Sequence, residues 1–246
     1  MKNIIYITTY FLVLVFITAP KVESQENLSE NNTELEALKV KTVDSVKMIR
    51  PTKNERAMTA YNLGTSLMRQ NKLDEAEKLF NEAISLDPEF IDAIDHLGIV
   101  YRRQNRLEEA ETMYLCSIEL NKENTVPFIN LAVIYRIQGK LNDAFQLYRH
   151  VAQIQPDYPE GYYGIGEIFY IVGNYENAMI FFNKAIELYN EINSPAVYDA
   201  YYYKGMIYYL DEKYEEALHY LEEARKGNPN DEILKNTINE IRNRKY

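Results

Sequence analysis

The chain has 246 residues and is 46% hydrophobic, which is enough apolar material for one or two globular domains. Its formal net charge of −10 argues against a nucleic-acid partner, because phosphate binding requires a concentrated basic surface. The single cysteine, Cys116, excludes an internal disulfide and a thiolate metal cluster.

Residues 1–24 are predicted to be a signal peptide. A short positive start containing Lys2 precedes a mainly apolar run over residues 4–17, which is shorter than the roughly 20 residues that a membrane span needs. Val22 and Ser24 fit the small-residue positions before a cleavage site, so we expect cleavage near Ser24. This predicts an exported protein, periplasmic or secreted. An uncleaved N-terminal membrane anchor is the alternative.

Residues 25–56 are predicted to be a polar linker followed by a capping helix. Residues 25–33 are polar and lack apolar periodicity, which is typical of disorder. Apolar residues then recur at nearly helical spacing up to Ile49, and Pro51 cannot continue a helix. We expect a helix that ends before Pro51 and covers the first repeat.

From Ala57 onward a pattern of 34 residues recurs. The units are residues 57–90, 91–124, 125–158 and 159–192, and then 198–231 after an insertion at 193–197. Each unit contains two amphipathic helical patterns separated by a polar turn. Small residues at two fixed positions would let the two helices approach closely, and a bulky residue would fill the space between them. These positions hold Gly64, Gly98, Ala132, Gly166 and Gly205 (eighth), Ala76, Ala110, Ala144, Ala178 and Ala217 (twentieth), and Phe80, Tyr114, Tyr148, Phe182 and Leu221 (twenty-fourth).

This pattern resembles the tetratricopeptide repeat (TPR) over residues 57–231. The resemblance implies an all-α fold, an α-solenoid of stacked antiparallel helix pairs forming a right-handed superhelix. The first helix of each pair would line its concave face. At the seventh position of the first unit, Leu63 is expected to pack in the core. Residues 232–246 are predicted to form a C-terminal capping helix with its apolar residues inward: Ile233, Leu234, Ile238 and Ile241.

No residue pattern indicates catalysis or a cofactor. The histidines His96, His150 and His219 fall in different units without a partner at metal-ligand spacing, and there is no phosphate-binding glycine loop or nucleophile elbow. Cys116 and His150 share the twenty-sixth position of consecutive units, which we expect to face solvent. The sequence therefore predicts a protein that is not an enzyme and that uses no cofactor and no metal.

A binding function is expected on the concave face, from the second, fifth, ninth and twelfth positions of the first helices. This face changes along the chain from an arginine ridge, which could attract a carboxylate-bearing segment, to a tyrosine surface offering rigid contact area. Alternatively, the arginines solvate the turns and the tyrosines pack on neighbouring units. The candidate partner-binding residues are Tyr61, Arg69, Arg102, Arg103, Ile129, Arg136, Tyr163, Tyr170, Tyr202 and Tyr209.

These residues predict a protein–protein interaction module that binds a peptide segment of a partner protein in its groove, outside the cytoplasm. One TPR sub-type binds C-terminal carboxylates through a lysine and an asparagine at positions where this chain has Tyr61 and Thr65, so that mode is not expected. No nucleic acid and no membrane span after signal cleavage are expected. The alternatives are a self-associating scaffold and, less favoured, an accessory subunit of an enzyme or a secretion complex.

Overall fold

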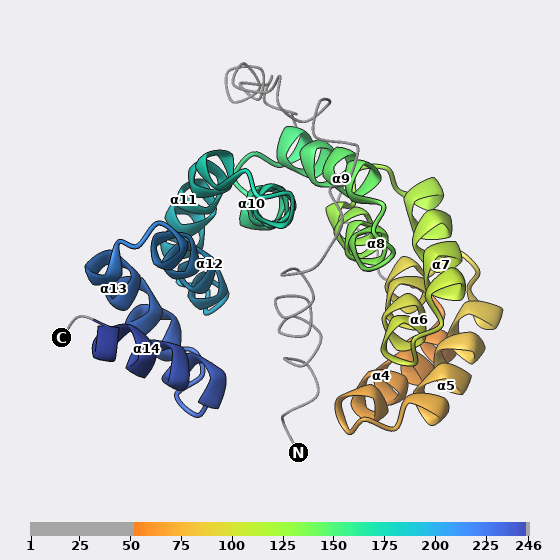
Figure 1. Cartoon of the computed structure of the whole chain (residues 1–246). Helices are drawn as coiled ribbons and strands as arrows, with labels where there is room; N and C mark the ends of the chain where they lie inside the picture. Colours follow the sequence, from red (N-terminus) through yellow and green to blue (C-terminus); the bar gives the residue numbers. More distant parts are fainter. Residues whose placement is uncertain (1–51, 245–246) are drawn as a thin grey trace. The chain divides into compact units, whose positions relative to one another are not determined.

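The computed structural model describes residues 52–244, which belong to a compact unit spanning residues 40–246. The predicted signal peptide and N-terminal capping helix lie outside the described residues. Within residues 52–244 the chain forms eleven α-helices and no strand (Figure 1). The prediction of an all-α solenoid of helix pairs is confirmed.

The first ten of these helices form consecutive pairs, each joined by a short turn, and a last helix follows them (Figure 1). The pairs are α4 (Glu55–Arg69) with α5 (Leu73–Leu86), α6 (Ile91–Arg103) with α7 (Leu107–Leu120), α8 (Thr125–Ile137) with α9 (Leu141–Ile154), α10 (Pro159–Ile171) with α11 (Tyr175–Glu191), and α12 (Val197–Leu210) with α13 (Tyr214–Arg225); α14 spans Glu232–Arg244.

The turn inside each pair has the same backbone conformation. One residue adopts a positive φ, and the backbone N–H after it bonds back to a carbonyl near the end of the first helix; Lys72, for example, donates to Leu67 at 3.0 Å. This is the Schellman motif, which satisfies carbonyls left free at a helix end. The residues with positive φ in these five turns are Asn71 (63°), Asn105 (61°), Gly139 (75°), Gly173 (80°) and Glu212 (57°).

The helices of each pair meet at the predicted small residues. The alanine at the twentieth position of every unit is fully buried, and the bulky residue at the twenty-fourth position is buried beside it. Because alanine adds almost no width to a helix, the second helix can lie close to its neighbours. The fourth pair departs from the others, since α11 has 17 residues where α5 and α9 have 14. The extra turn lies within the fourth unit, before the insertion at 193–197, and it contains Tyr189 as a buried residue near the end of the helix.

The stack begins at α4 with a largely polar surface. Leu63 is 53% exposed, so the prediction that it packs in the core is wrong. Thr59 and Ser66 on the same side of α4 are exposed as well. In the second unit the corresponding residues are buried because α5 packs against α6: Ala93, Leu97 and Val100.

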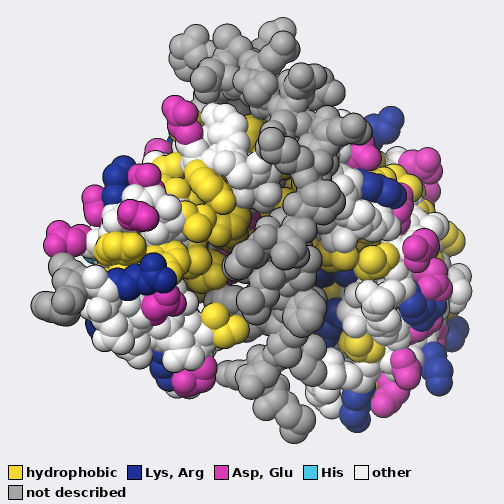
Figure 2. Space-filling view, viewed as in Figure 1, with side chains coloured by type: hydrophobic (Ala, Val, Ile, Leu, Met, Phe, Trp, Pro, Cys, Tyr) yellow, Lys and Arg dark blue, Asp and Glu magenta, His cyan; other side chains and the backbone are white. Residues whose placement is uncertain are grey.

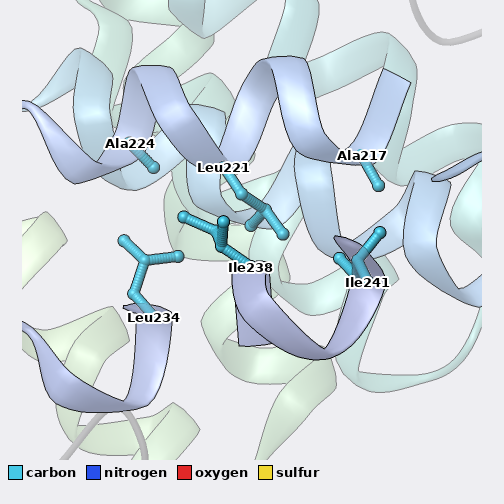
Figure 3. Packing of buried hydrophobic residues seen from close by; sticks show 6 residues of the cluster. All are labelled: Ala217, Leu221, Ala224, Leu234, Ile238 and Ile241. Atoms are coloured by element: carbon cyan, nitrogen blue, oxygen red, sulfur yellow. The ribbon is translucent and has the colours of Figure 1, made fainter. Parts of the chain in front are cut away.

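The last helix covers the apolar end of the stack, as Figure 3 shows. Leu234, Ile238 and Ile241 recur at helical spacing and pack against α13, where they meet Ala217, Leu221 and Ala224. Ile233 is 53% exposed, so its predicted inward orientation is wrong. It lies one residue before the apolar stripe and therefore points to another side of α14.

The first helices form one continuous face. Successive first helices contact each other, α4 with α6, α6 with α8, α8 with α10 and α10 with α12. Among the helices in Figure 1, α8, α10 and α12 lie on one side of the stack, and their partners α9, α11 and α13 lie on the other. We call the side formed by the second, fifth, ninth and twelfth residues of the first helices the inner face.

Candidate functional site

The ten predicted partner-binding residues all lie on the first helices, two on each. Arg69 and Arg103 are exposed, and the other eight are partly buried. The predicted residues are Tyr61 and Arg69 on α4, Arg102 and Arg103 on α6, Ile129 and Arg136 on α8, Tyr163 and Tyr170 on α10, and Tyr202 and Tyr209 on α12.

Arg103 is engaged with the preceding helix pair. Its Nη1 donates to the carbonyl oxygen of Met68 at 3.0 Å, and its Nη2 donates to Oδ1 of Asn71 at 2.9 Å. These bonds tie the end of α6 to the turn after α4. For Arg103 the structure therefore favours the turn-solvating alternative over a free binding residue.

Arg136 faces a carboxylate of the chain itself. Its Nε lies 3.6 Å from Oε2 of Glu167, and the two side chains are 14% and 4% exposed. Burial alone would lower the pKa of Arg136, but Glu167 and nearby tyrosine hydroxyls together raise that pKa above its usual value. The hydroxyl of Tyr203 donates to the other carboxylate oxygen of Glu167 at 2.9 Å. The inner face between α8 and α12 thus contains a buried, internally paired charge.

A second polar cluster lies in the α6–α7 pair. Asp95 is 5% exposed, and its Oδ2 accepts a hydrogen bond from Nδ2 of Asn124 at 3.3 Å. Burial raises the pKa of Asp95 to about 6, although the bonds with Ser117 and Asn124 oppose the rise. Arg102 lies near the hydroxyl of Tyr114, whose pKa burial raises to about 12. Together these groups place one acid and one base on the α6 part of the inner face.

The predicted tyrosine surface is organised around a residue that the sequence analysis did not select, Tyr203. Its ring stacks on Phe182 with centroids 5.0 Å apart and an interplanar angle of 9°. Tyr170, Tyr202 and Tyr163 contact it at centroid distances of 5.0, 5.7 and 6.0 Å. Tyr203 occupies the sixth position of its unit, beside the groove positions that periodicity singled out. An aromatic residue where the preceding unit has Gly164 was the available signal.

The tyrosines at the two ends of the inner face also pack on neighbouring elements. The ring of Tyr61 lies 5.0 Å from that of Phe90 and 5.1 Å from that of His96, which belongs to the next helix pair. The hydroxyl of Tyr209 donates to Oε1 of Glu240 on α14 at 3.2 Å. For these two residues the structure favours the packing alternative, although both keep part of their surface accessible.

Carboxylates gather on the inner face of α10 and α12. Glu160 and Glu167 lie on α10 and Asp199 on α12, whereas α10 contains no lysine or arginine and α12 contains only Lys204. Lys204 donates to Oδ1 of Asn183 at 2.6 Å and lies over the ring of Tyr220, away from this cluster. Their second and ninth positions in the units predict these acids on the inner face, although they are not among the ten predicted binding residues.

The described part of the chain offers no metal site and no membrane span. Between residues 52 and 244 no group of three or more His, Cys, Asp and Glu side chains is placed to hold a metal ion. Cys116 is exposed, as predicted. Over the same residues no helix combines the length and the apolar character needed to cross a membrane.

Comparison with protein families identifies the repeat. Residues 157–229 match a family described as tetratricopeptide repeat, and residues 47–155 match the cilia and flagella-associated protein 70 middle TPR-like domain. Between them the two matches include nearly all of the described helices. The chain contains tetratricopeptide repeats. A search of curated proteins finds no match to it.

Solved TPR structures share the fold of this TPR protein at low sequence identity. A chain from the crystal structure of the APC/C hetero-tetramer Cut9-Hcn1 aligns with a TM-score of 0.72 and 18% identity, covering 78% of this chain and 38% of that one. TTC0263, a thermophilic TPR protein of Thermus thermophilus, aligns at 0.62 and 17%, covering 75% and 98%. YrrB, described as a TPR protein with an unusual peptide-binding site, aligns at 0.51 and 24%, covering 74% and 91%. The TPR protein therefore spans well under half the length of the first of these chains.

Proposed function

We propose that this TPR protein binds a peptide segment of a partner protein on its inner face and catalyses no reaction. The observation that carries the proposal is that each repeat contains two kinds of position, those that pair the helices and those that lie on the inner face. Small and bulky residues that pair the helices recur at fixed positions, whereas the inner-face residue at the fifth position changes from Tyr61 to Asp95, Ile129, Tyr163 and Tyr202. Residues that vary within a fixed frame can present a particular surface to a ligand without altering the fold.

The chemistry of the inner face supports a peptide ligand. Partly exposed tyrosine rings supply large contact area at little cost in side-chain entropy, and charged groups beside them can select for a complementary sequence. The peptide-binding site named for YrrB is a precedent within the same fold. The observations on the described residues provide no comparable support for a reaction.

We also infer that binding occurs outside the cytoplasm, because residues 1–24 have the charge and hydropathy pattern of a signal peptide. N-terminal sequencing of the protein recovered from the exported fraction tests this point. A new N-terminus near residue 25 is the expected result, and an intact Met1 on cytoplasmic protein would contradict it.

The binding proposal is tested by in-cell crosslinking followed by mass spectrometry, using two matched variants. Ile129→Trp places a bulky side chain on the inner face, where Ile129 is partly buried. Leu115→Trp is the control, because Leu115 is 44% exposed on α7, a second helix. We expect Ile129→Trp to lose the captured partner and Leu115→Trp to retain it, with both melting like the wild type.

Retention of every partner by a folded Ile129→Trp protein would refute binding on the inner face. Light scattering at several concentrations addresses the alternative of a self-associating scaffold. A concentration-independent monomer is expected, and growth of the scattering mass with concentration would favour the scaffold instead.

A further inference from the structure

The inner face of α10 and α12 has unbalanced negative charge. Glu167 is paired with Arg136, but no lysine or arginine within residues 52–244 forms an ion pair with Glu160 or Asp199. Asp199 is exposed and Glu160 is partly buried, so a ligand can reach both carboxylates. Carboxylates held near each other without a counter-charge favour a cation supplied from outside.

Titration of these carboxylates agrees with the missing counter-charge. Burial raises the pKa of Glu160, the bond with Tyr189 opposes that rise, and the charges of Glu167 and Asp199 add to it. A bound cation would reverse the effect of these charges and favour the ionised form of both acids. The energetic benefit of a cation is therefore larger here than at an isolated surface carboxylate.

Aromatic rings line the same part of the inner face. The ring of Tyr163 lies 6.3 Å from that of Tyr189, and Tyr189 also bonds to Glu160. Tyr189 lies near the end of α11, in the part of the helix that extends beyond the length of α5 and α9. Tyr189 is 2% exposed, so it can hold Glu160 in place but cannot offer its ring to a ligand, whereas the ring of Tyr163 is partly exposed. Rings beside carboxylates suit a cationic side chain, because the ring face attracts positive charge.

Arginines gather at the opposite end of the inner face, in the last turns of α4 and α6. The ends of α4 and α6 carry Arg69, Arg102 and Arg103, which would repel a cation. A basic group on a bound segment would therefore be directed to α10 and α12 and away from α4 and α6. Figure 2 shows hydrophobic side chains exposed around this α10–α12 part of the stack, which would accept apolar residues next to the basic one.

From this charge complementarity we propose that the α10–α12 part of the inner face binds a lysine or arginine side chain of a peptide segment, between the carboxylates of Glu160 and Asp199 and beside the ring of Tyr163. The proposal rests on the proposed function and specifies its ligand, a basic peptide segment. It assigns the principal recognition to the carboxylate and tyrosine end, whereas the sequence predicted both the arginines and the tyrosines as binding residues.

Fluorescence anisotropy with three short labelled peptides tests the assignment on the full chain. Each peptide consists of copies of one tripeptide, Lys-Ser-Leu, Gln-Ser-Leu or Glu-Ser-Leu, so that the three peptides differ mainly in charge. The double variant Glu160→Gln/Asp199→Asn removes the two carboxylates with little change of shape. The control Glu82→Gln/Glu119→Gln removes two exposed carboxylates from the second helices α5 and α7.

We expect the lysine peptide to bind roughly 10-fold or more tightly than the glutamine peptide, and to lose about that factor in the Glu160→Gln/Asp199→Asn protein but not in the control. Equal loss in both double variants would show general attraction to an acidic protein and overturn the proposal. A preference for the glutamate peptide would also overturn it and would indicate that the arginines of the inner face bind the peptide.

The proposed function is judged separately from this assignment. If all three peptides bind equally and Ile129→Trp abolishes binding, the inner face binds peptides but the basic specificity is wrong. If no peptide binds, the basic specificity is again wrong, and the crosslinking capture decides whether the inner face has a protein partner.

Discussion

The Arg136–Glu167 ion pair joins α8 and α10, and removal of one of its two charges is expected to cost much more stability than removal of both. In the Arg136→Met variant, Glu167 keeps its negative charge in a place where its side chain is 4% exposed. In Arg136→Met/Glu167→Gln both charges are gone, and the glutamine oxygen can still accept the hydroxyl of Tyr203. The single variant should therefore be much less stable than the double variant.

The separation of the two groups sets the magnitude. At 3.6 Å and an effective dielectric constant of about 20, the attraction is about 5 kcal/mol. Removal of one partner from a buried pair typically costs about 3–5 kcal/mol, because the remaining charge stays desolvated without compensation. We expect Arg136→Met to lower the free energy of unfolding by about that amount, and the double variant to lie within about 1 kcal/mol of the wild type.

Urea denaturation followed by far-UV circular dichroism and by tyrosine fluorescence measures both values. Coincident transitions are needed, because stacked repeats can unfold in separate steps. Arg103→Met is the matched control, since it removes an exposed arginine with two hydrogen bonds and should cost only about 1 kcal/mol. A loss below about 0.5 kcal/mol for Arg136→Met, or a double variant as unstable as the single one, would refute the reasoning.

Three further predictions concern single positions. The folded-state pKa of Asp95 is about 6 against 3.8 unfolded, so the native state holds a proton that the unfolded chain releases. Asp95 should therefore lower the free energy of unfolding by about 3 kcal/mol as the pH rises from about 4 to above 6, and urea titrations of Asp95→Asn should show a pH dependence smaller than that of the wild type by this amount. Glu212→Gly should raise the midpoint of thermal unfolding, with a gain of about 1 kcal/mol, because its φ of 57° suits glycine, whereas Gly139→Ala at φ 75° should lower it; a destabilised Glu212→Gly protein would contradict this. Ile238→Ala, at a site 2% exposed, should cost about 2–5 kcal/mol in chemical denaturation, while Ile233→Ala at 53% exposure should be nearly neutral; similar losses would show that α14 packs differently.

Much of the fold was predictable because the residues that pack the helices together recur at the same positions in every repeat. Ala76 and its four counterparts show where two helices must approach closely, and Phe80 with its counterparts shows what fills the space between them. A residue that recurs in every copy answers a requirement that every copy shares, namely the pairing of the two helices. The helix pairs therefore follow from the sequence.

Failures occurred where a residue's neighbours differ between copies. Leu63 has the same place in its repeat as Leu97, but α4 has no described helix pair before it, and the leucine is exposed. Ile233 matches the composition of an apolar face yet lies one position outside the stripe that contacts α13. Periodicity gives the side of a helix, whereas burial depends on whether another element lies there.

The candidate site was likewise predictable in part. The sequence alone determined that the chain is a stack of TPR helix pairs and which residues lie on its inner face, because helical spacing assigns a face before any tertiary contact forms. Only the tertiary structure decided what those residues do: Arg136 meets Glu167 from the next repeat, Arg103 bonds to the previous turn, and Glu160 and Asp199 form no ion pair with another residue between 52 and 244. Pairing of charges depends on distances between side chains some 30 residues apart in sequence, and those distances are set by how the repeats stack.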